Sequence, residues 1–338
     1  MVGLHEYWIA DGHNDSVIKY QAGECDLRKP DGYGHWYLEG AEKAALGLQI
    51  MAMYIESEYK PFQASWRGLQ LIESALDFIE ANRRKLIPIN KKRDLSKLGG
   101  SRIGILISVE GGEILGESLF MLDIIYRLGV RALGLTWNQR NAIADGVGEE
   151  YSKNGLSLFG RRVIAEMNNL GMLIDLSHLN EPGFWDVLQL SNKPVVASHS
   201  CAHVLCDHPR NLSDEQLRAL AEAGGMVGIN FCPDFLRQTG QAKIDDVIRH
   251  ICHIAEVAGV DSVGFGSDFD GITSTPEGLE NVEKFNCLRE MLEKSGFNRE
   301  EMAKICHVIL SGFWKKFSKR DQLINIFNIR EWVNNSIR

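Results

Sequence analysis

The chain has 338 residues, of which 44% are hydrophobic and 24% are charged, as is typical of a globular protein with a large core. Its formal net charge is −8 and the basic runs 83–85 and 91–93 are short, which argues against a nucleic-acid partner. No apolar run approaches the roughly 18 residues that a membrane-spanning helix needs, and the first residues lack the basic-then-apolar pattern of a signal peptide, so we expect no membrane partner.

The seven cysteines are scattered along the chain and form no Cys-x-x-Cys pair. An odd number of unclustered cysteines argues against a disulfide framework and against a cysteine-rich zinc site. We therefore expect a reducing compartment and a cytoplasmic localisation.

Eight short apolar runs are spaced along the chain and are predicted to be strands. Most are continuous runs of Val, Ile, Leu and Gly rather than alternating ones, which is typical of parallel strands covered on both faces. The predicted strands are Tyr7–Ala10, Leu46–Met53, Ile103–Val109, Val130–Thr136, Met172–Ser177, Pro194–Ser198, Met226–Phe231 and Ser262–Ser267.

Longer amphipathic stretches alternate with these runs and are predicted to be helices. Ser213 with Gln216 forms a capping box at one helix start, and Gly171 and Gly224 stand where two helices should stop. The predicted helices cover 63–82, 118–128, 156–170, 181–190, 213–223, 244–258, 280–294 and 298–309.

Eight strands, each followed by a helix, indicate an α/β fold of the (β/α)8 TIM barrel type, with a doubly wound open sheet as the alternative. No linker or internal repeat divides the chain, so we expect residues 1–338 to form one domain. The long segment 19–45 has no clear periodicity. As the first loop after a strand, it is predicted to lie near the active site as a lid or a substrate wall, or else to be a plain surface loop.

Side chains that could bind a metal or transfer a proton follow five of the eight predicted strands. The first of them lies in the run DGHNDS, residues 11–16, where His13 and Asp15 are two residues apart. Each position alone has an ordinary structural explanation, such as a core histidine, a loop acid or a helix cap. Active-site groups of a barrel come from the carboxyl ends of its strands, however, so one metal centre would explain all of them together. The residues are His13, Asp15, Glu110, His178, His199 and Asp268.

This set of side chains suits a particular chemistry. Imidazoles and carboxylates are the ligands of Zn²⁺ and similar ions, and a glutamate such as Glu110 is long enough to bridge two of them. A metal-bound water loses a proton near neutral pH and becomes a nucleophile, and Asp268 is placed to accept that proton and pass it to a leaving amine. We therefore expect a metal-dependent hydrolase.

The sequence as a whole resembles the membrane (renal) dipeptidases, which are metallopeptidases on an amidohydrolase-type barrel. The resemblance covers roughly residues 9–317. The motifs that carry it, in chain order, are DGHND, the run CDLRKPDGYGHWYLEGAEKAALGLQIMAMY, the EGG of 110–112, GLSLFGRRVIAEMNNLGMLIDLSH, PVVASHS, HPRNLSDEQL and VGFGSDFDG.

The resemblance implies a zinc-dependent dipeptidase that hydrolyses the amide bond of dipeptides through a hydroxide bridging two Zn²⁺ ions, with a homodimer as the expected assembly. His13, Asp15 and Glu110 would hold one ion, and Glu110, His178 and His199 the other. Asp268 would be the catalytic proton shuttle. Arg210 would bind the terminal carboxylate of the substrate, for which a bidentate guanidinium is well suited.

One position departs from the family pattern. Where the animal enzymes have a histidine that contacts the reacting substrate, this sequence reads Leu135-Thr136-Trp137-Asn138. The indole N–H of Trp137 or the amide of Asn138 could donate a hydrogen bond to an oxyanion, so both are predicted to bind substrate.

Two alternative functions remain open from the sequence. One is a metal-dependent phosphoesterase or lactonase on the same barrel, although only Arg210 and Arg140 offer cations near the strand ends. The other is a non-catalytic module that binds metal.

Overall fold

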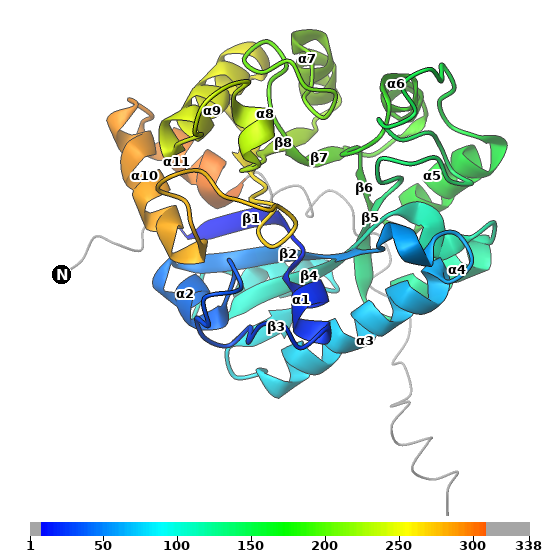
Figure 1. The fold of residues 1–338 in the computed structure, drawn as a ribbon, viewed down its shortest axis with the longest axis horizontal. Coiled ribbons are helices and arrows are strands. Elements are labelled where there is room, and N and C mark those ends of the chain that lie inside the picture. Colours follow the sequence, from blue (N-terminus) through cyan, green and yellow to red (C-terminus); the bar gives the residue numbers. More distant parts are fainter. Residues whose placement is uncertain (1–7, 309–338) are drawn as a thin grey trace, which may run out of the picture.

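The computed structural model describes residues 8–308, in which eight parallel strands close into a barrel (Figure 1). Each strand of the barrel pairs with the next, and β9 pairs with β1 through Asp11 and Phe265 to complete the ring. The predicted (β/α)8 barrel is confirmed, and the doubly wound alternative is wrong because the sheet closes. The barrel strands are β1 (Ile9–Asn14), β2 (Leu46–Tyr54), β4 (Ile103–Glu110), β5 (Val130–Gly134), β6 (Leu173–Asp175), β7 (Val196–Ser200), β8 (Met226–Ile229) and β9 (Val263–Phe265).

Helices surround the barrel, as Figure 1 shows. All eight predicted helices are present, with ends displaced by up to five residues; the predicted end of the last one, at 309, lies outside the described residues. The helices are α1 (Ser16–Gln21), α2 (Leu38–Lys43), α3 (Ala64–Ala81), α4 (Leu119–Arg127), α5 (Leu158–Leu170), α6 (Glu181–Leu190), α7 (Asp214–Glu222), α8 (Pro233–Leu236), α9 (Ile244–Ala258), α10 (Phe285–Lys294) and α11 (Arg299–Ala303), the last continuing as a π-helical turn, Lys304–Val308.

The helix ends follow the signals in the sequence. The Ser213 hydroxyl accepts a hydrogen bond from the backbone N–H of Gln216, and the Gln216 side chain accepts one from the N–H of Ser213, which confirms the capping box. Gly171 ends α5 in the left-handed conformation, with φ of 72°. These local signals set where α5 ends and where α7 begins.

The first strand lies further along the chain than predicted. It runs through Asp11, Gly12 and His13, which look like turn residues in the sequence. Asp11 is fully buried and accepts hydrogen bonds from the backbone and hydroxyl of Ser267 and from the Gln49 amide. A Cβ at Gly12 would lie 2.9 Å from the Phe265 carbonyl oxygen. Asp11 can lie in a strand because its carboxylate is hydrogen-bonded inside the barrel, and Gly12 because a larger residue would not fit there.

Four short strands and helices were not predicted. Strand β3 (Leu86–Pro88) pairs with the first residues of β4, outside the ring of eight. Helix α2 and the end of α1 lie within the segment 19–45, which was predicted to be a loop. Helix α8 is only four residues long.

The segment 19–45 is fastened to the chain after β9 by the buried carboxylate of Asp270. This carboxylate accepts hydrogen bonds from Ser16, Lys19 and the backbone N–H groups of His35 and Trp36. The long loop is therefore held beside the turn that also carries Asp268.

Candidate metal centre

Six side chains selected from the sequence meet at the carboxyl ends of the strands. His13 and His199 lie within β1 and β7, Glu110 is the last residue of β4, and His178 and Asp268 follow β6 and β9 by three residues. All six are buried, including Asp15 directly after β1. The barrel therefore brings together residues up to 255 positions apart, from Asp268 to His13.

Glu110 stands at the centre of this cluster. Its Oε2 lies 3.5 Å from His13 Nε2, which is itself 3.3 Å from Asp15 Oδ2. Its Oε1 lies 2.7 Å from His178 Nε2 and 3.5 Å from His199 Nε2. The two oxygens of one carboxylate thus face two separate groups of potential ligands.

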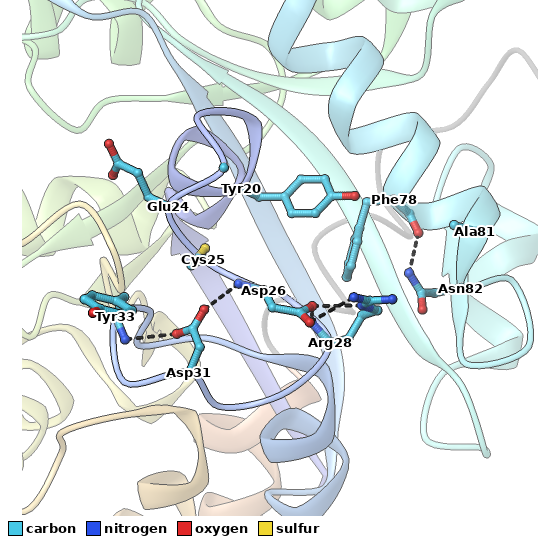
Figure 2. A pocket seen from close by; sticks show the side chains of 11 residues that line it. Tyr20, Glu24, Cys25, Asp26, Arg28, Asp31, Tyr33, Phe78, Ala81 and Asn82 are labelled. Atoms are coloured by element: carbon cyan, nitrogen blue, oxygen red, sulfur yellow. Dashed lines mark hydrogen bonds and ion pairs between the residues drawn. The ribbon is translucent and has the colours of Figure 1, made fainter.

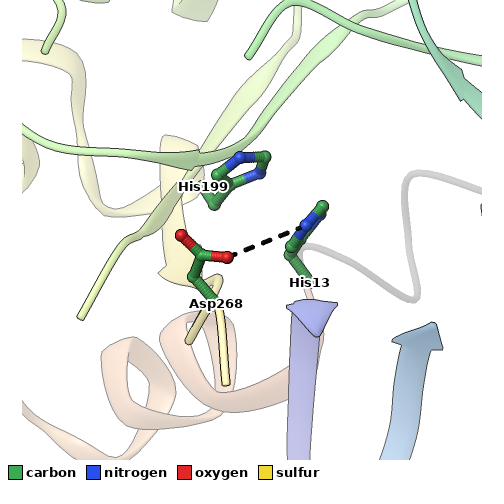
Figure 3. Close-up of side chains that lie close together, drawn as sticks. All are labelled: His13, His199 and Asp268. Carbon is green, nitrogen blue, oxygen red and sulfur yellow. Dashed lines mark ion pairs between the residues drawn. The ribbon is translucent and has the colours of Figure 1, made fainter. Parts of the chain in front are cut away.

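Asp268 lies next to His13 and His199, as Figure 3 shows. Its Oδ1 is 3.9 Å from His13 Nε2, and the rings of His13 and His199 are 3.8 Å apart between centroids. One ligand atom from each of these three residues fits within 4.8 Å of the others. Asp268 Oδ2 accepts a hydrogen bond of 2.9 Å from the buried amide of Asn230.

The electrostatics of two of the three histidines favour a bound cation. Burial lowers the pKa of His178 and of His199 to about 4, with Arg210 adding to the effect, so both rings are neutral and can donate a lone pair at neutral pH. Burial also lowers the pKa of His13, but Asp15 and Glu110 outweigh it and the net shift is upward. Burial, Glu110 and Asp268 raise the pKa of Asp15.

Several polar atoms of the cluster have no protein partner. His13 Nε2 and Asp15 Oδ1 are buried and have no hydrogen-bond partner among residues 8–308. The Nε2 atoms of His178 and His199 face each other at 2.9 Å, although at most one of two neutral rings could donate there. Such converging lone pairs, together with three carboxylates, fit a divalent ion with nitrogen and oxygen ligands.

The backbone of the cluster takes unusual conformations. His178 and Asp268 have φ of 68° and 60°, a region that non-glycine residues rarely occupy. Gly271 passes so close to the carboxylates of Asp15 and Asp268 that a Cβ would overlap both. The conformations that aim these side chains at the cluster therefore depend on a tightly fitted turn.

Asn138 contacts a potential ligand rather than open space. Its Oδ1 accepts a hydrogen bond of 2.7 Å from His178 Nδ1, which leaves His178 Nε2 free to face Glu110. The sequence suggested a substrate contact for Asn138 and did not reveal this positioning role.

Trp137 forms part of an aromatic wall beside the cluster. Its ring centroid is 5.8 Å from that of His178 and 5.2 Å from that of Tyr54, and Lys60 Nζ lies 5.2 Å from it. Lys60 also pairs with the buried Glu113 at 3.3 Å. Tyr54 is the last residue of β2 and Lys60 follows that strand; they carried no signal in the sequence because neither is a usual metal ligand.

Arg210 is buried beside the same cluster. Only 5% of it is exposed; its Nη2 donates to the His199 carbonyl oxygen at 3.1 Å, and its Nε has no hydrogen-bond partner in the described part of the chain. Burial lowers the pKa of Arg210, while Asp268 and Glu110 oppose the shift. A guanidinium that remains charged and only partly satisfied is suited to bind an anion.

A separate surface cavity of about 630 Å³ lies away from these residues, between the loop after α1 and helix α3 (Figure 2). Its acids are satisfied locally: Asp26 pairs with Arg28, and Asp31 accepts backbone N–H groups of Asp26 and Tyr33. None of the six clustered residues lines it.

A closed parallel barrel with imidazoles and carboxylates at its carboxyl ends defines an amidohydrolase-type metal-dependent hydrolase. The sequence profile of the family described as membrane dipeptidase (peptidase family M19) matches residues 4–316. The chain belongs to this family, and it is accordingly a metallopeptidase that hydrolyses dipeptides.

Individual relatives agree with this assignment. An uncharacterized dipeptidase of Schizosaccharomyces pombe is 33% identical over 91% of this chain and 80% of the yeast protein. A metallopeptidase of Rhodobacter sphaeroides, solved with a phosphinate mimic of the dipeptide L-Ala-D-Ala, is 30% identical with a TM-score of 0.86, covering 92% of this chain and 99% of that one. The metallopeptidase dipeptidase AC is 31% identical with the same TM-score, covering 92% and 98%.

Within residues 8–308, every helix is too short or too polar to cross a bilayer.

Proposed function

We propose that this dipeptidase works with two Zn²⁺ ions that share Glu110. His13, Asp15 and Glu110 would hold one ion, and Glu110, His178 and His199 the other. The observation that carries this proposal is the position of Glu110, whose two oxygens each face a different pair of potential ligands. The nitrogen-rich donor set favours zinc over magnesium or calcium, which prefer all-oxygen ligands.

The ions, when bound, supply a polarised substrate carbonyl and a water of lowered pKa. Asp268 is the group that accepts the proton of the attacking water and delivers it to the leaving amine. The amide of Asn230 holds one Asp268 oxygen, so that the other, Oδ1, faces the reaction.

Arg210 is proposed to bind the terminal carboxylate of the dipeptide. Its support is the buried guanidinium with an unpartnered Nε, next to the His199 carbonyl. Trp137 is proposed to form one wall of the substrate site and to offer its indole N–H to the developing oxyanion. Asn138 would assist from its amide nitrogen while its oxygen holds His178.

Dipeptides, including those with a D-residue at the carboxyl end, are the proposed substrates. The related Rhodobacter sphaeroides metallopeptidase was solved with a mimic of L-Ala-D-Ala, which supports this substrate class. The phosphoesterase and lactonase alternatives have no comparable support.

A dipeptide panel combined with elemental analysis tests the proposal. The purified protein should contain about two zinc ions per chain, cleave dipeptides, lose activity after chelation and regain it with added zinc. Hydrolysis of phosphoesters or lactones in place of dipeptides, or metal binding without any turnover, would favour the alternative functions.

We also propose a homodimer. Support comes from large apolar side chains that are exposed at the starts of α3 and α4, namely Phe62, Trp66 and Phe120. Sedimentation velocity would give the mass of the particle in solution, and a monomer at micromolar concentration would contradict this part of the proposal.

A cytoplasmic location is proposed from the state of the cysteines. All seven are free thiols, and four of them lie at intermediate or exposed positions. Free thiols persist in a reducing compartment. Fractionation of the source cells with detection of the chain would test this assignment.

A further inference from the structure

The hydroxyl of Ser198 in β7 lies beneath two of the clustered histidines. It hydrogen-bonds to Asp175 Oδ2 and lies 2.7 Å from His199 Nδ1 and 3.4 Å from His13 Nδ1. A second hydroxyl, that of Ser177, is 3.4 Å away. All of these groups are buried, so their hydrogen bonds must be satisfied within the protein.

The carboxylate of Asp175 fixes the direction of these hydrogen bonds. Its Oδ1 accepts from the backbone N–H groups of Ser177 and Ser198, at 3.0 and 2.9 Å. Its Oδ2 can only accept, so the Ser198 hydroxyl donates its one proton to Asp175. The two lone pairs of Ser198 then remain to accept hydrogen bonds from the imidazoles.

A neutral imidazole that donates from Nδ1 carries its free lone pair on Nε2, and a histidine that binds a metal ion is in this neutral form. His199 Nε2 lies 2.9 Å from His178 Nε2 and 3.5 Å from Glu110 Oε1. His13 Nε2 faces the other Glu110 oxygen and Asp15. One hydroxyl therefore selects the ligating tautomer of a histidine in each of the two ligand groups.

We propose that Ser198, oriented by Asp175, is a positioning residue shared by both zinc ions. It acts from beneath the cluster, whereas Glu110 acts between the ions. The inference rests on the proposed two-zinc function. It differs from the role of Asn138, which holds only His178 and so acts on a single ion.

Zinc titration of the metal-free protein against a chromophoric chelator tests this inference. Ser198→Ala should weaken the binding of both ions by about 10-fold to 100-fold each, the usual effect of removing a group that orients a ligand. Asn138→Ala should weaken only one. Ser200→Ala is the matched control, because its hydroxyl is buried in the same strand and has no hydrogen-bond partner in residues 8–308.

The tautomers can be read directly by ¹⁵N NMR of histidine-labelled protein loaded with zinc. In the wild type, His13 and His199 should each carry a proton on Nδ1 and a zinc-shifted Nε2, and in Ser198→Ala the Nδ1 resonances should move. The wild-type spectrum decides the matter even where the variant fails to fold. A wild type with Nδ1 as the ligating atom of either ring would overturn the inference.

The outcomes separate the two proposals. A wild type that binds fewer than two zinc ions contradicts the proposed function. A wild type that binds two, with Ser198→Ala losing affinity at one site only or no more than Ser200→Ala, contradicts the shared role of Ser198 and leaves the proposed function standing.

Discussion

His178 and Asp268 occupy left-handed backbone positions that cost of order 1–3 kcal/mol each for residues with a side chain. Regular strand pairing ends at Asp175 and Phe265, and the chain must then turn sharply to aim the next side chains at the barrel axis. This backbone strain occurs at the potential metal ligand His178 and at the proposed proton acceptor Asp268. Substitutions of even a small side chain at these turns should therefore reduce metal binding or activity.

Gly271 offers the cleanest test of this packing. In Gly271→Ala, the added methyl would overlap the carboxylates of Asp15 and Asp268, so we expect zinc affinity to fall at least about 10-fold. Competitive titration measures the loss. Gly100→Ala is the control, since its Cβ would meet only the Lys97 carbonyl oxygen at 3.4 Å, and equal affinities in the two variants would contradict the prediction.

Asp268→Asn separates proton transfer from metal binding. The amide keeps the shape of the side chain but cannot take up the proton, so turnover should fall by about 10²-fold to 10⁴-fold. Steady-state kinetics and elemental analysis on the same sample check this. Loss of one zinc ion from the variant would instead identify Asp268 as a ligand.

His250 in α9 should make stability depend on pH. Its Nδ1 accepts from the backbone of Ala202 and its Nε2 donates to Leu236, so the neutral ring is fully satisfied. Burial lowers its pKa to about 4 from 6.5. The unfolded chain therefore takes up the proton first, and stability should fall by about 3 kcal/mol as the pH decreases from 6.5 to 4.

Urea unfolding of the metal-free protein across this pH range measures the effect. Other histidines titrate as well, so the contribution of His250 is the difference between the wild type and His250→Gln. Parallel curves for the two proteins would show that His250 does not titrate as expected.

At the scale of elements, the long segment 19–45 depends on one carboxylate. Asp270→Asn weakens the charged hydrogen bonds to Lys19 and Ser16 and should destabilise the loop by several kcal/mol, because the carboxylate is buried. Hydrogen exchange should then quicken at the amides of His35 and Trp36. Asp26→Asn, which breaks the exposed pair with Arg28 on the same loop, should change stability by less than about 1 kcal/mol.

The sequence predicted long, strongly patterned elements well and short or polar ones poorly. Helices α3 and α9 differ from their predicted ranges by at most one residue at either end, because a long apolar periodicity defines them. Strand β1 was misplaced, since Asp11 and Gly12 are turn residues by composition and only the closed barrel satisfies them. Strand β3 has three residues, too few for a pattern.

The candidate site was predictable for a related reason. In a closed barrel the carboxyl ends of all strands lie at the same face, so the residue types that follow the strands predict which side chains form the site, even when no distances are known. The residues that hydrogen-bond to these side chains, such as Asn230 to Asp268, were not predictable. They are ordinary polar residues, and only the folded structure shows which side chains they contact.

At the scale of the whole molecule, metal removal should destabilise the fold. A ligand that binds only the native state adds RT ln(1 + [L]/Kd), about 4 kcal/mol when zinc exceeds its Kd 1,000-fold. Chelation should therefore lower Tm, and added zinc should restore it. An unchanged Tm would mean that the folded chain binds zinc weakly. The extent of the single domain remains a prediction for 1–338, since residues 1–7 and 309–338 lie outside the described structure.

The barrel closes where its first strand, β1, meets its last, β9. His13 and Asp268 lie at this seam, so a nascent chain on the ribosome holds the first half of the centre long before the second half is made. The chain can therefore hydrolyse peptides only after β9 has been made and the barrel has closed. A fragment that ends before β9 should be inactive toward peptides even when it retains most of its helices.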